Sequence, residues 1–257
     1  MFIRSKALFF SLFKRLSGYI SGRGFARLPF ATTFYQFLYK HLRPTGIVEV
    51  EVMGSRLFVN SHDTGSAPYL IMHGEWDPPQ TDIIKALLKE KMVFVDIGAN
   101  IGYFSLLAAG IVGETGKVIA FEPDVDNYAL LMENIETNSS KNIIPVRKAV
   151  SDNAGKASFY LKSENLSAHS LVKEKDTTVV EVETVTLDDF LGDDLTAHVI
   201  KIDVEGAEPL VWKGMQKTIS ANKKCAIITE FYPNAIVALG YSPAEYLYNI
   251  VRAGFVL

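Results

Sequence analysis

The hydrophobic pattern of the chain changes at about residue 92. From there on, short and almost wholly apolar runs alternate with longer segments whose apolar residues recur every three or four positions. The short runs predict strands that are buried on both faces, and the longer segments predict helices with one polar face. The predicted strands are 92–96, 117–121, 143–149, 198–203 and 225–230, and the predicted helices are about 101–112, 124–138, 205–219 and 242–253. This alternation predicts an α/β domain with a mostly parallel sheet covered on both faces.

The segment 151–195 is too long to be a simple connection within this alternation. It contains two stretches of strand-like composition, 157–161 and 180–185, and we expect them to form an antiparallel pair beside the sheet. A long structured insertion near a site often acts as a lid or a substrate loop, and a hairpin without such a role is an equally good interpretation.

The pattern before residue 92 predicts different elements. Residues 47–52 alternate apolar and acidic side chains, Met53-Gly54-Ser55 suits a turn, and 56–60 reads as a returning strand, so we expect a hairpin. A helix is predicted at 82–91, with Thr81 as its N-terminal cap. The predicted organisation is a basic helical segment at 1–45, a hairpin with a lead-in helix at 46–91, and the α/β domain at 92–257 with its insertion at 151–195.

The N-terminal segment combines an apolar helical face with an excess of positive charge. Residues 1–43 contain eight basic side chains and no acidic one, although the whole chain has a formal net charge of −3. Helical spacing places one set of apolar residues opposite a polar and basic set, namely Phe9, Phe13, Leu16 and Ile20 against Arg4, Ser11, Lys14 and Arg15. A second short helix is predicted at 30–42.

Two interpretations of this segment remain open. Its apolar run is too short to span a bilayer, which takes about 20 residues, and no signal-peptide cleavage site follows it. A basic amphipathic helix suits peripheral contact of residues 1–28 with an anionic membrane surface. It equally suits a helix docked on its own domain or on a sister subunit of a homo-oligomer.

Composition otherwise indicates an ordinary globular protein, with 48% hydrophobic and 21% charged residues. The single cysteine, Cys225, excludes an internal disulfide and lies in an apolar run, so we expect a small core residue in a reducing compartment. The predicted location is therefore the cytoplasm, with membrane association as the addition that the N-terminal segment would bring.

The segment from Val93 to Gly102 carries the strongest chemical signal. An apolar strand runs into a glycine turn at Gly98, and a helix begins after Gly102. The next predicted strand ends in Glu122, 24 residues after Gly98. A glycine turn lets the backbone approach a ligand closely, and a carboxylate at the tip of the next strand can accept hydrogen bonds from ribose hydroxyls.

The order of residues in this turn favours a cationic nucleoside over a dinucleotide. A dinucleotide site uses G-x-G-x-x-G, whereas the chain has D-I-G-A-N-I-G at 96–102. The Asp96 carboxylate would repel a pyrophosphate and would attract an ammonium group. Adenosine with a cationic amino-acid tail is S-adenosylmethionine, and we expect it to lie between Asp96 and Glu122.

More carboxylates are expected on the same rim of the sheet. If the first strand of the sheet is central, the tip of the fourth strand faces the same crevice, which places Asp203 in the site. Glu205 and Glu208 also fit the ordinary role of acids at a helix N-terminus. Asp203, Glu205 and Glu230 offer the hard oxygen ligands that divalent cations prefer, but they lack a recognisable ligand spacing, so no metal is predicted.

His169 is the histidine best placed to act as a base, because it lies in the insertion that would cover the site. A loop histidine without a role is the alternative.

Five motifs together resemble the FkbM-type S-adenosylmethionine-dependent methyltransferases over about residues 92–254: D-I-G-A-N-I-G at 96–102, F-E-P at 121–123, A-V-S-D at 149–152, T-L-D-D at 186–189 and I-D-V-E-G-A-E at 202–208. The resemblance implies a Rossmann-like class I methyltransferase fold and methylation of hydroxyl oxygens, often on sugars or natural products. It also implies a role for each matching residue: Asp96, Gly98, Asn100 and Gly102 around the methionine part of the cofactor, Glu122 at the ribose, Ala149 and Val150 beside the adenine, and Asp203 and Glu205 flanking the methyl group and the acceptor. The family fold is expected to continue with further strands, whereas this sequence reads Gly254-Phe255-Val256-Leu257 at that point, so we expect a shorter sheet or a strand from a partner chain.

The predicted chemistry is direct displacement at the methyl carbon. The sulfonium is already activated, so the protein mainly aligns the acceptor, and an alcohol must also lose its proton. The candidate bases are Asp203, Glu205 and His169, in that order. The expected acceptor is a small molecule or a glycan and not a nucleic acid. Two alternatives remain, a catalytically silent binding protein and an NAD-dependent oxidoreductase, and the missing phosphate turn disfavours the second.

Overall fold

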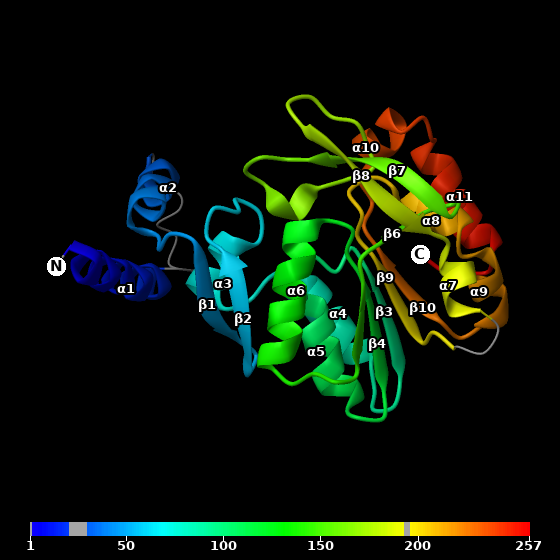
Figure 1. Ribbon diagram of the computed structural model, residues 1–257, viewed down its shortest axis with the longest axis horizontal. Helices are drawn as coiled ribbons and strands as arrows, with labels where there is room; N and C mark the ends of the chain where they lie inside the picture. Colours follow the sequence, from blue (N-terminus) through cyan, green and yellow to red (C-terminus); the bar gives the residue numbers. More distant parts are fainter. Residues whose placement is uncertain (1, 21–29, 193–195) are drawn as a thin grey trace.

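A five-stranded parallel sheet forms the centre of the molecule (Figure 1). The computed structural model describes residues 2–20, 30–192 and 196–257. The strand order is β10-β9-β3-β4-β5, with these bounds: β3 (Val93–Ile97), β4 (Lys117–Phe121), β5 (Ile143–Val146), β9 (Val199–Ile202) and β10 (Ala226–Thr229). The predicted parallel sheet is confirmed, and so is the central place of the first strand, because β3 pairs with both β4 and β9.

The two faces of the sheet pack against different helices, which is why its strands are mostly apolar. Phe94 and Val118 belong to one core cluster, and their neighbours Val95 and Ile119 belong to another, as the alternation of side chains along a strand requires. In Figure 1 the helices of the first face lie to the left of the sheet and those of the second face to the right. Those of the first face are α4 (Pro78–Leu87), α5 (Tyr103–Val112) and α6 (Val125–Thr137), and those of the second are α7 (Leu187–Leu191), α8 (Glu208–Lys213), α9 (Gln216–Ala221), α10 (Pro233–Ala238) and α11 (Pro243–Arg252).

The insertion contributes β7 (Gly155–Leu161) and β8 (Thr178–Val185), which form a second sheet of order β6-β8-β7 with β6 (Ala149–Val150). The predicted antiparallel pairing of β7 with β8 is confirmed. The single predicted strand at 143–149 is wrong, because it divides between the two sheets. Its partner β4 ends at Phe121, which pairs with Val146, and Ala149 then pairs with Thr184 of β8.

Two predicted helices also have different bounds. The helix predicted at 205–219 is two helices, α8 and α9, separated at Gly214. A Cβ on Gly214 would lie 2.0 Å from the backbone oxygen of Ser151. This close contact with the chain at Ser151 accounts for the glycine and for the break in the helix. The helix predicted at 82–91 begins earlier, as α4. Asp77 caps it by accepting a hydrogen bond from the Gln80 amide, and Pro78 occupies its first turn. Thr81 does not cap it, because its hydroxyl bonds to the backbone oxygen of Trp76 and to the Tyr103 hydroxyl.

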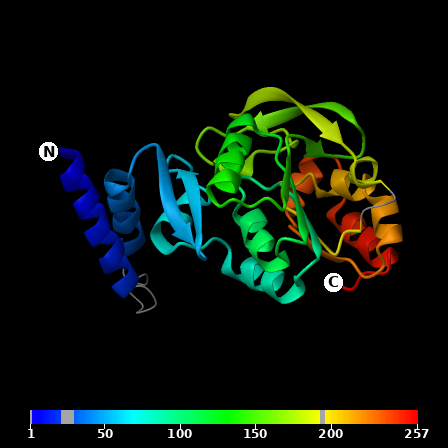
Figure 2. The same cartoon turned by 60° about the horizontal axis from the view of Figure 1, so that its bottom comes forward.

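The predicted hairpin is confirmed as β1 (Ile47–Val52) and β2 (Ser55–Asn60). Asn134 of α6 fixes it to the α/β domain, because its side chain accepts a hydrogen bond from the Phe58 amide at 2.6 Å and donates one to the Phe58 carbonyl. A short helix, α3 (Ala67–His73), follows the hairpin. Figure 2 shows the hairpin between the sheet and two N-terminal helices, α1 (Phe2–Ile20) and α2 (Ala31–Leu42).

The predicted apolar face of the N-terminal helix is confirmed at Phe13 and is wrong at Phe9 and Leu16. Phe10 and Phe13 pack against Tyr39 of α2, whereas Phe9 and Leu16 remain exposed. The predicted polar face is confirmed for Ser11, Lys14 and Arg15, which are exposed, and the side chains of Arg4 and Ile20 lie outside the described residues. Among the described helices, we find none that is both long and apolar enough to cross a bilayer.

Cys225 is a buried core residue, as the sequence predicts, and burial raises the pKa of its thiol to about 12.

Candidate active site

The turn after β3 touches the turn after β9, and this contact brings the predicted motif and the predicted rim together. Gly98 has φ 82, and a Cβ on it would lie 1.9 Å from the backbone oxygen of Asp203. Its amide and that of Ala99 donate to the Phe121 carbonyl at 3.0 and 2.9 Å, which adds the end of β4 to the same junction. Gly98 therefore allows three strand ends to meet at one point. Gly102, with φ 92, precedes the first residue of α5.

Glu122 lies at the end of β4 and is 5% exposed. Its carboxylate accepts hydrogen bonds from the amides of Asn100, at 2.8 Å, and Asp124, at 2.9 Å. Each oxygen keeps a lone pair for a further donor. Burial raises the pKa of Glu122 to about 8; the Asp124 charge adds to this rise and the two amide hydrogen bonds oppose it.

Glu122 opens into a cavity that combines residues of both motifs with residues of the insertion. The lining residues comprise Ile97, Gly98, Asn100, Phe121, Glu122, Pro123, Asn127, Lys148, Ala149, Val150, Phe159, Leu166, Ser167, His169, Leu171, Asp203 and Val204. The cavity therefore holds five of the predicted cofactor-binding residues besides Asp203. Gly102 and Asp96 are outside this lining set.

The insertion forms one wall of the cavity through residues 163–172, which we call the wall loop. The Asp63 carboxylate, just after β2, accepts hydrogen bonds from the Leu166 amide at 2.8 Å and the Ser167 hydroxyl at 3.2 Å. Asn127 of α6 donates to the Leu166 carbonyl at 3.0 Å. At its other end, the Ser170 hydroxyl donates to the Glu205 carbonyl at 2.9 Å. The wall loop is thus attached to the hairpin side, to α6 and to the turn after β9.

Asp96 has a partner inside the protein. It has no exposed surface, one of its oxygens lies 3.2 Å from the Lys201 ammonium, and the other accepts a hydrogen bond from the Ser105 hydroxyl at 2.7 Å. Lys201, itself 1% exposed, also lies 3.3 Å from the Asp203 carboxylate and donates to the Gly98 carbonyl at 3.3 Å. Its ammonium lies 5.1 Å from the centre of the Phe104 ring. Asp96 therefore forms a buried ion pair with Lys201, and its contact with the methionine part of the cofactor stays a prediction.

Burial alone would lower the pKa of Lys201, but the charges on Asp203 and Asp96 outweigh it and raise that pKa above its ordinary value. Lys201 is thus a fixed cation beneath the site.

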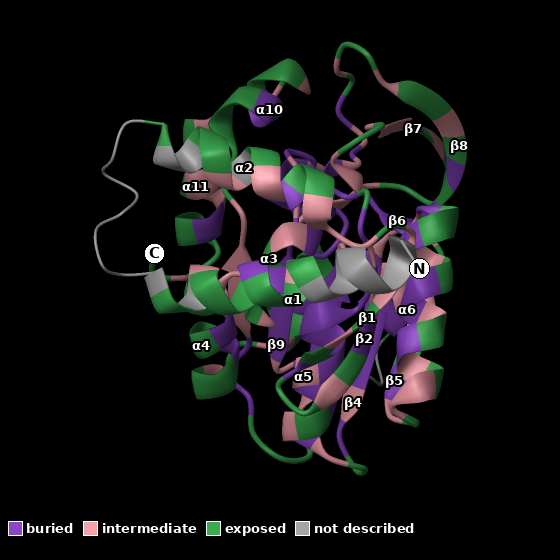
Figure 3. Cartoon of the chain, turned by 90° about the vertical axis from the view of Figure 1, so that its left-hand side faces the viewer, coloured by how far each residue is buried: buried purple, intermediate pink, exposed green. Residues whose placement is uncertain are grey.

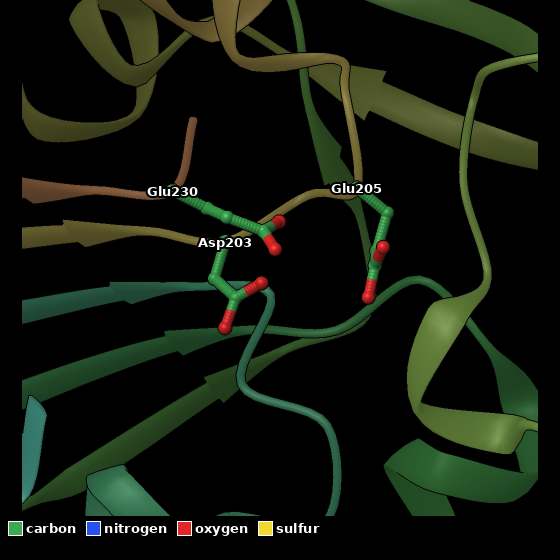
Figure 4. A group of neighbouring side chains, drawn as sticks. All are labelled: Asp203, Glu205 and Glu230. Carbon is green, nitrogen blue, oxygen red and sulfur yellow. The ribbon is translucent and has the colours of Figure 1, made fainter. Parts of the chain in front are cut away.

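Three carboxylates converge on one space at the ends of β9 and β10 (Figure 4). Asp203, Glu205 and Glu230 each place an oxygen within 4.8 Å of the others. Burial raises the pKa of Glu205 to about 7, and the Asp203 charge adds to the rise. Burial, and then the charges on Asp203 and Glu205, raise the pKa of Glu230 to about 8. Close acids relieve their repulsion by holding a proton or a cation, so the cluster is suited to accept a proton near neutral pH.

His169 lines the cavity from the wall loop, and its Nδ1 accepts a hydrogen bond from the Lys162 amide at 3.0 Å. Burial lowers the pKa of His169, which favours the neutral ring. In a neutral ring whose Nδ1 is an acceptor, Nε2 carries the proton. His169 is therefore arranged as a hydrogen-bond donor, and this geometry disfavours it as a base.

The family model for the methyltransferase FkbM domain matches residues 96–257, the part of the chain that builds this site. The chain belongs to this family. FkbM methyltransferases are S-adenosylmethionine-dependent enzymes with a class I Rossmann-like fold, so S-adenosylmethionine is the cofactor that the family assigns to the site.

Known relatives are methyltransferases of several kinds. The hexuronic acid methyltransferase AglP of Haloferax volcanii is 31% identical over 147 residues, which are 55% of this chain and 59% of that protein. A solved structure of methyltransferase FkbM from Methylobacillus flagellatus KT has 21% identity and a TM-score of 0.42, and the similarity covers 61% of this chain and 39% of that one. An S-adenosylmethionine-dependent O-methyltransferase from Thermotoga maritima has 14% identity and a TM-score of 0.43, over 82% of this chain and 65% of that one. The chain thus spans less than two thirds of the length of these relatives.

Within this FkbM domain, the residues that local sequence could not reveal come from other elements. Asn127 and Lys148 line the cavity, and Asp63 fixes the wall loop from outside the α/β domain. Asp63 carried a detectable signal, because an acid followed by Thr64, Gly65 and Ser66 is typical of a side chain that bonds to nearby amides. Its bond to Leu166 joins residues 103 positions apart, and no local pattern encodes that.

Proposed function

We propose that this FkbM methyltransferase transfers the methyl group of S-adenosylmethionine to a hydroxyl oxygen of a sugar or glycan. The observation that carries the proposal is the Glu122 carboxylate, which is held by the Asn100 and Asp124 amides and opens into the cavity beside Gly98 and Asp203. Its free lone pairs suit the two ribose hydroxyls of a nucleoside.

The remaining lining fits the other parts of that cofactor. Gly98 lines the cavity with backbone atoms alone, which suits a closely approaching methionine moiety. Ala149 and Val150 are buried apolar residues in the lining, suited to one face of an adenine. When bound, the cofactor supplies an activated methyl group on its sulfonium. The protein then has to align the acceptor and accept its proton.

We assign the proton transfer to Glu205 and the orientation of the acceptor to Asp203. The pKa of Glu205, raised by burial and by Asp203 to about 7, suits a base that works near neutral pH. Asp203 reaches from the cavity lining to the carboxylate cluster and is held by Lys201 at 3.3 Å, so it can accept a hydrogen bond from the acceptor without moving.

The carboxylate cluster also bears on the class of acceptor. An acidic acceptor group placed against Asp203, Glu205 and Glu230 would be repelled, whereas a neutral hydroxyl would not. The relative AglP is described as a hexuronic acid methyltransferase, which supports a sugar acceptor. We therefore expect the reacting group to be a sugar hydroxyl and not a carboxylate.

Calorimetry and methyl transfer test the proposal together. We expect S-adenosylhomocysteine to bind the wild type. Above pH 8, where Glu122 is ionised, Glu122→Gln should weaken this binding by about 10- to 100-fold, as the loss of charge-assisted hydrogen bonds predicts. Glu205→Gln should keep the binding and lose transfer to sugar hydroxyls, detected as the mass of one added CH₂ group. Glu133→Gln, on the exposed face of α6, is the matched control and should change neither. If the wild type does not bind S-adenosylhomocysteine, the alternative of a catalytically silent binding protein is favoured. Binding of NADH would instead favour an NAD-dependent oxidoreductase.

A further inference from the structure

The two N-terminal helices expose more apolar surface than their own packing uses. Phe10 and Phe13 of α1 face Tyr35 and Tyr39 of α2, with Phe13 and Tyr35 ring centres 5.3 Å apart. A second set of large side chains points away from this small core, at helical spacings of three and four. We call this set the exposed stripes: Phe9, Leu12 and Leu16 on α1, and Phe34 and Phe37 on α2.

The exposed stripes follow two helices that pack against each other, which is unusual for a monomer surface. Their side chains are between 52% and 62% exposed. Figure 3 views the molecule from this end and shows α1 and α2 side by side at the front, with exposed residues along both. Scattered apolar residues on a surface need no explanation, but adjoining rows of aromatic and aliphatic side chains mark a contact surface.

Charge identifies the kind of partner. The first 48 residues of the chain contain no acidic residue, and Lys14, Arg15 and Lys40 are exposed on the same two helices. A second copy of this surface would bring the same positive charges opposite one another. An anionic bilayer instead offers phosphates for the basic side chains and an apolar layer just below them for the exposed stripes.

We propose that α1 and α2 dock the protein on the surface of an anionic lipid bilayer. The helices lie in the plane of the headgroups, with Phe9, Leu16 and Phe34 inserted at the boundary with the acyl chains. Helical spacing places Arg15 and Lys40 beside the exposed stripes, where they contact the lipid phosphates, so the attraction depends on the charge of the membrane and weakens in salt. The residues of this surface precede the cavity-lining residues in the sequence, and the proposal does not depend on the identity of the methyl acceptor.

Vesicle sedimentation with the full chain tests this docking. The probes are vesicles of phosphatidylcholine alone and of phosphatidylcholine mixed with phosphatidylglycerol. We expect binding to the mixed vesicles, and Arg15→Gln with Lys40→Gln should lower it by about 30-fold, since each basic residue near an anionic surface contributes roughly 1 kcal/mol. Leu16→Gln with Phe34→Gln should lower binding to the same vesicles about tenfold or more, because the insertion of apolar side chains is lost.

The matched control replaces two apolar residues that are equally exposed elsewhere, Val179 of β8 and Tyr248 of α11, with glutamine. This control should bind like the wild type, and the thermal unfolding midpoint of every variant shows whether it is folded. The proposal is overturned if the wild type ignores anionic vesicles or binds both kinds equally. It is also overturned if light scattering finds a dimer that Leu16→Gln with Phe34→Gln dissociates, because a second copy would then cover the stripes.

Discussion

Replacing Lys201 with methionine removes the ammonium that lies 3.2 Å from Asp96 and 3.3 Å from Asp203. Methionine keeps most of the side-chain volume, so the main change is electrostatic. Asp96 has no exposed surface and would retain the Ser105 hydroxyl as its hydrogen-bond donor. Breaking a buried ion pair at one partner leaves an uncompensated charge and costs about 3–5 kcal/mol. We expect the free energy of unfolding to fall by that amount.

Urea unfolding followed by circular dichroism measures this loss, and second substitutions show where it arises. Lys201→Met combined with Asp96→Asn should recover most of the lost stability, because the buried charge is then absent. Lys201→Met combined with Asp203→Asn should recover less, since the Asp203 side chain is 30% exposed and water already screens it. A loss below about 1 kcal/mol for Lys201→Met would refute the reasoning, because that is the range of an exposed pair. Equal recovery by Asp96→Asn and Asp203→Asn would refute it as well.

Other predictions test the turn, the wall loop, the ribose carboxylate and the carboxylate cluster. Gly98→Ala should lower the thermal midpoint and abolish binding of S-adenosylhomocysteine, because the added Cβ meets the Asp203 carbonyl. The control Gly240→Ala, at a similar φ of 88 with nothing within 4 Å, should cost only the backbone strain. Equal effects of the two variants would show that the close approach to Asp203 is not what requires a glycine at 98. Asp63→Ala should speed proteolytic cleavage within 163–172 and weaken product binding, and unchanged digestion kinetics would show that the wall loop does not depend on it. Affinity for S-adenosylhomocysteine should rise as the pH rises through about 8, because Glu122 then loses its proton and its carboxylate accepts hydrogen bonds at both oxygens. Calorimetry of the Glu122→Gln variant should show an affinity that does not change with pH in this range. The same pH dependence in that variant would assign the titration to another group. Methyl transfer should be unchanged by EDTA, and a loss restored by Mg²⁺ would instead make Asp203, Glu205 and Glu230 a metal site.

The sheet and the cofactor turn could be predicted because their signals are local. Val93–Ile97 is apolar except for Asp96, so its burial on both faces follows from a few adjacent residues. Gly98 and Glu122 were identified for a similar reason, since a glycine turn and a carboxylate at a strand tip have a characteristic spacing. The start of α4 could also be predicted from local sequence, because an acid followed by proline, as in Asp77-Pro78, is typical of a helix N-terminus. The prediction of Thr81 as the cap did not use this signal.

The partners of the charged groups could not be predicted in this way. Asp96 and Lys201 are distant in sequence and become an ion pair only because β3 and β9 are neighbours in register, with Asp96 opposite Lys201. The sequence places Asp96 at the end of a strand. This position is equally consistent with a carboxylate that faces a ligand and with one that is buried beneath the ligand site. Similarly, the end of β5 at Val146 depends on where β4 ends, and no property of residues 143–149 records that.

The Asp63 carboxylate gives the N-terminal part of the chain a mechanical connection to the cavity. It follows β2 directly, and the same side chain holds the amides of Ser66 and Ala67 on one side and of Leu166 on the other. Any displacement of the hairpin relative to the large sheet must stretch these bonds or drag the wall loop with it. A force applied at the basic helices would therefore reach the ligand cavity through this carboxylate and through its neighbours Thr64 and Ser66, which bond to Glu164 and Ser167 of the wall loop. Mechanical coupling between the two ends of the molecule then needs no movement of the parallel sheet.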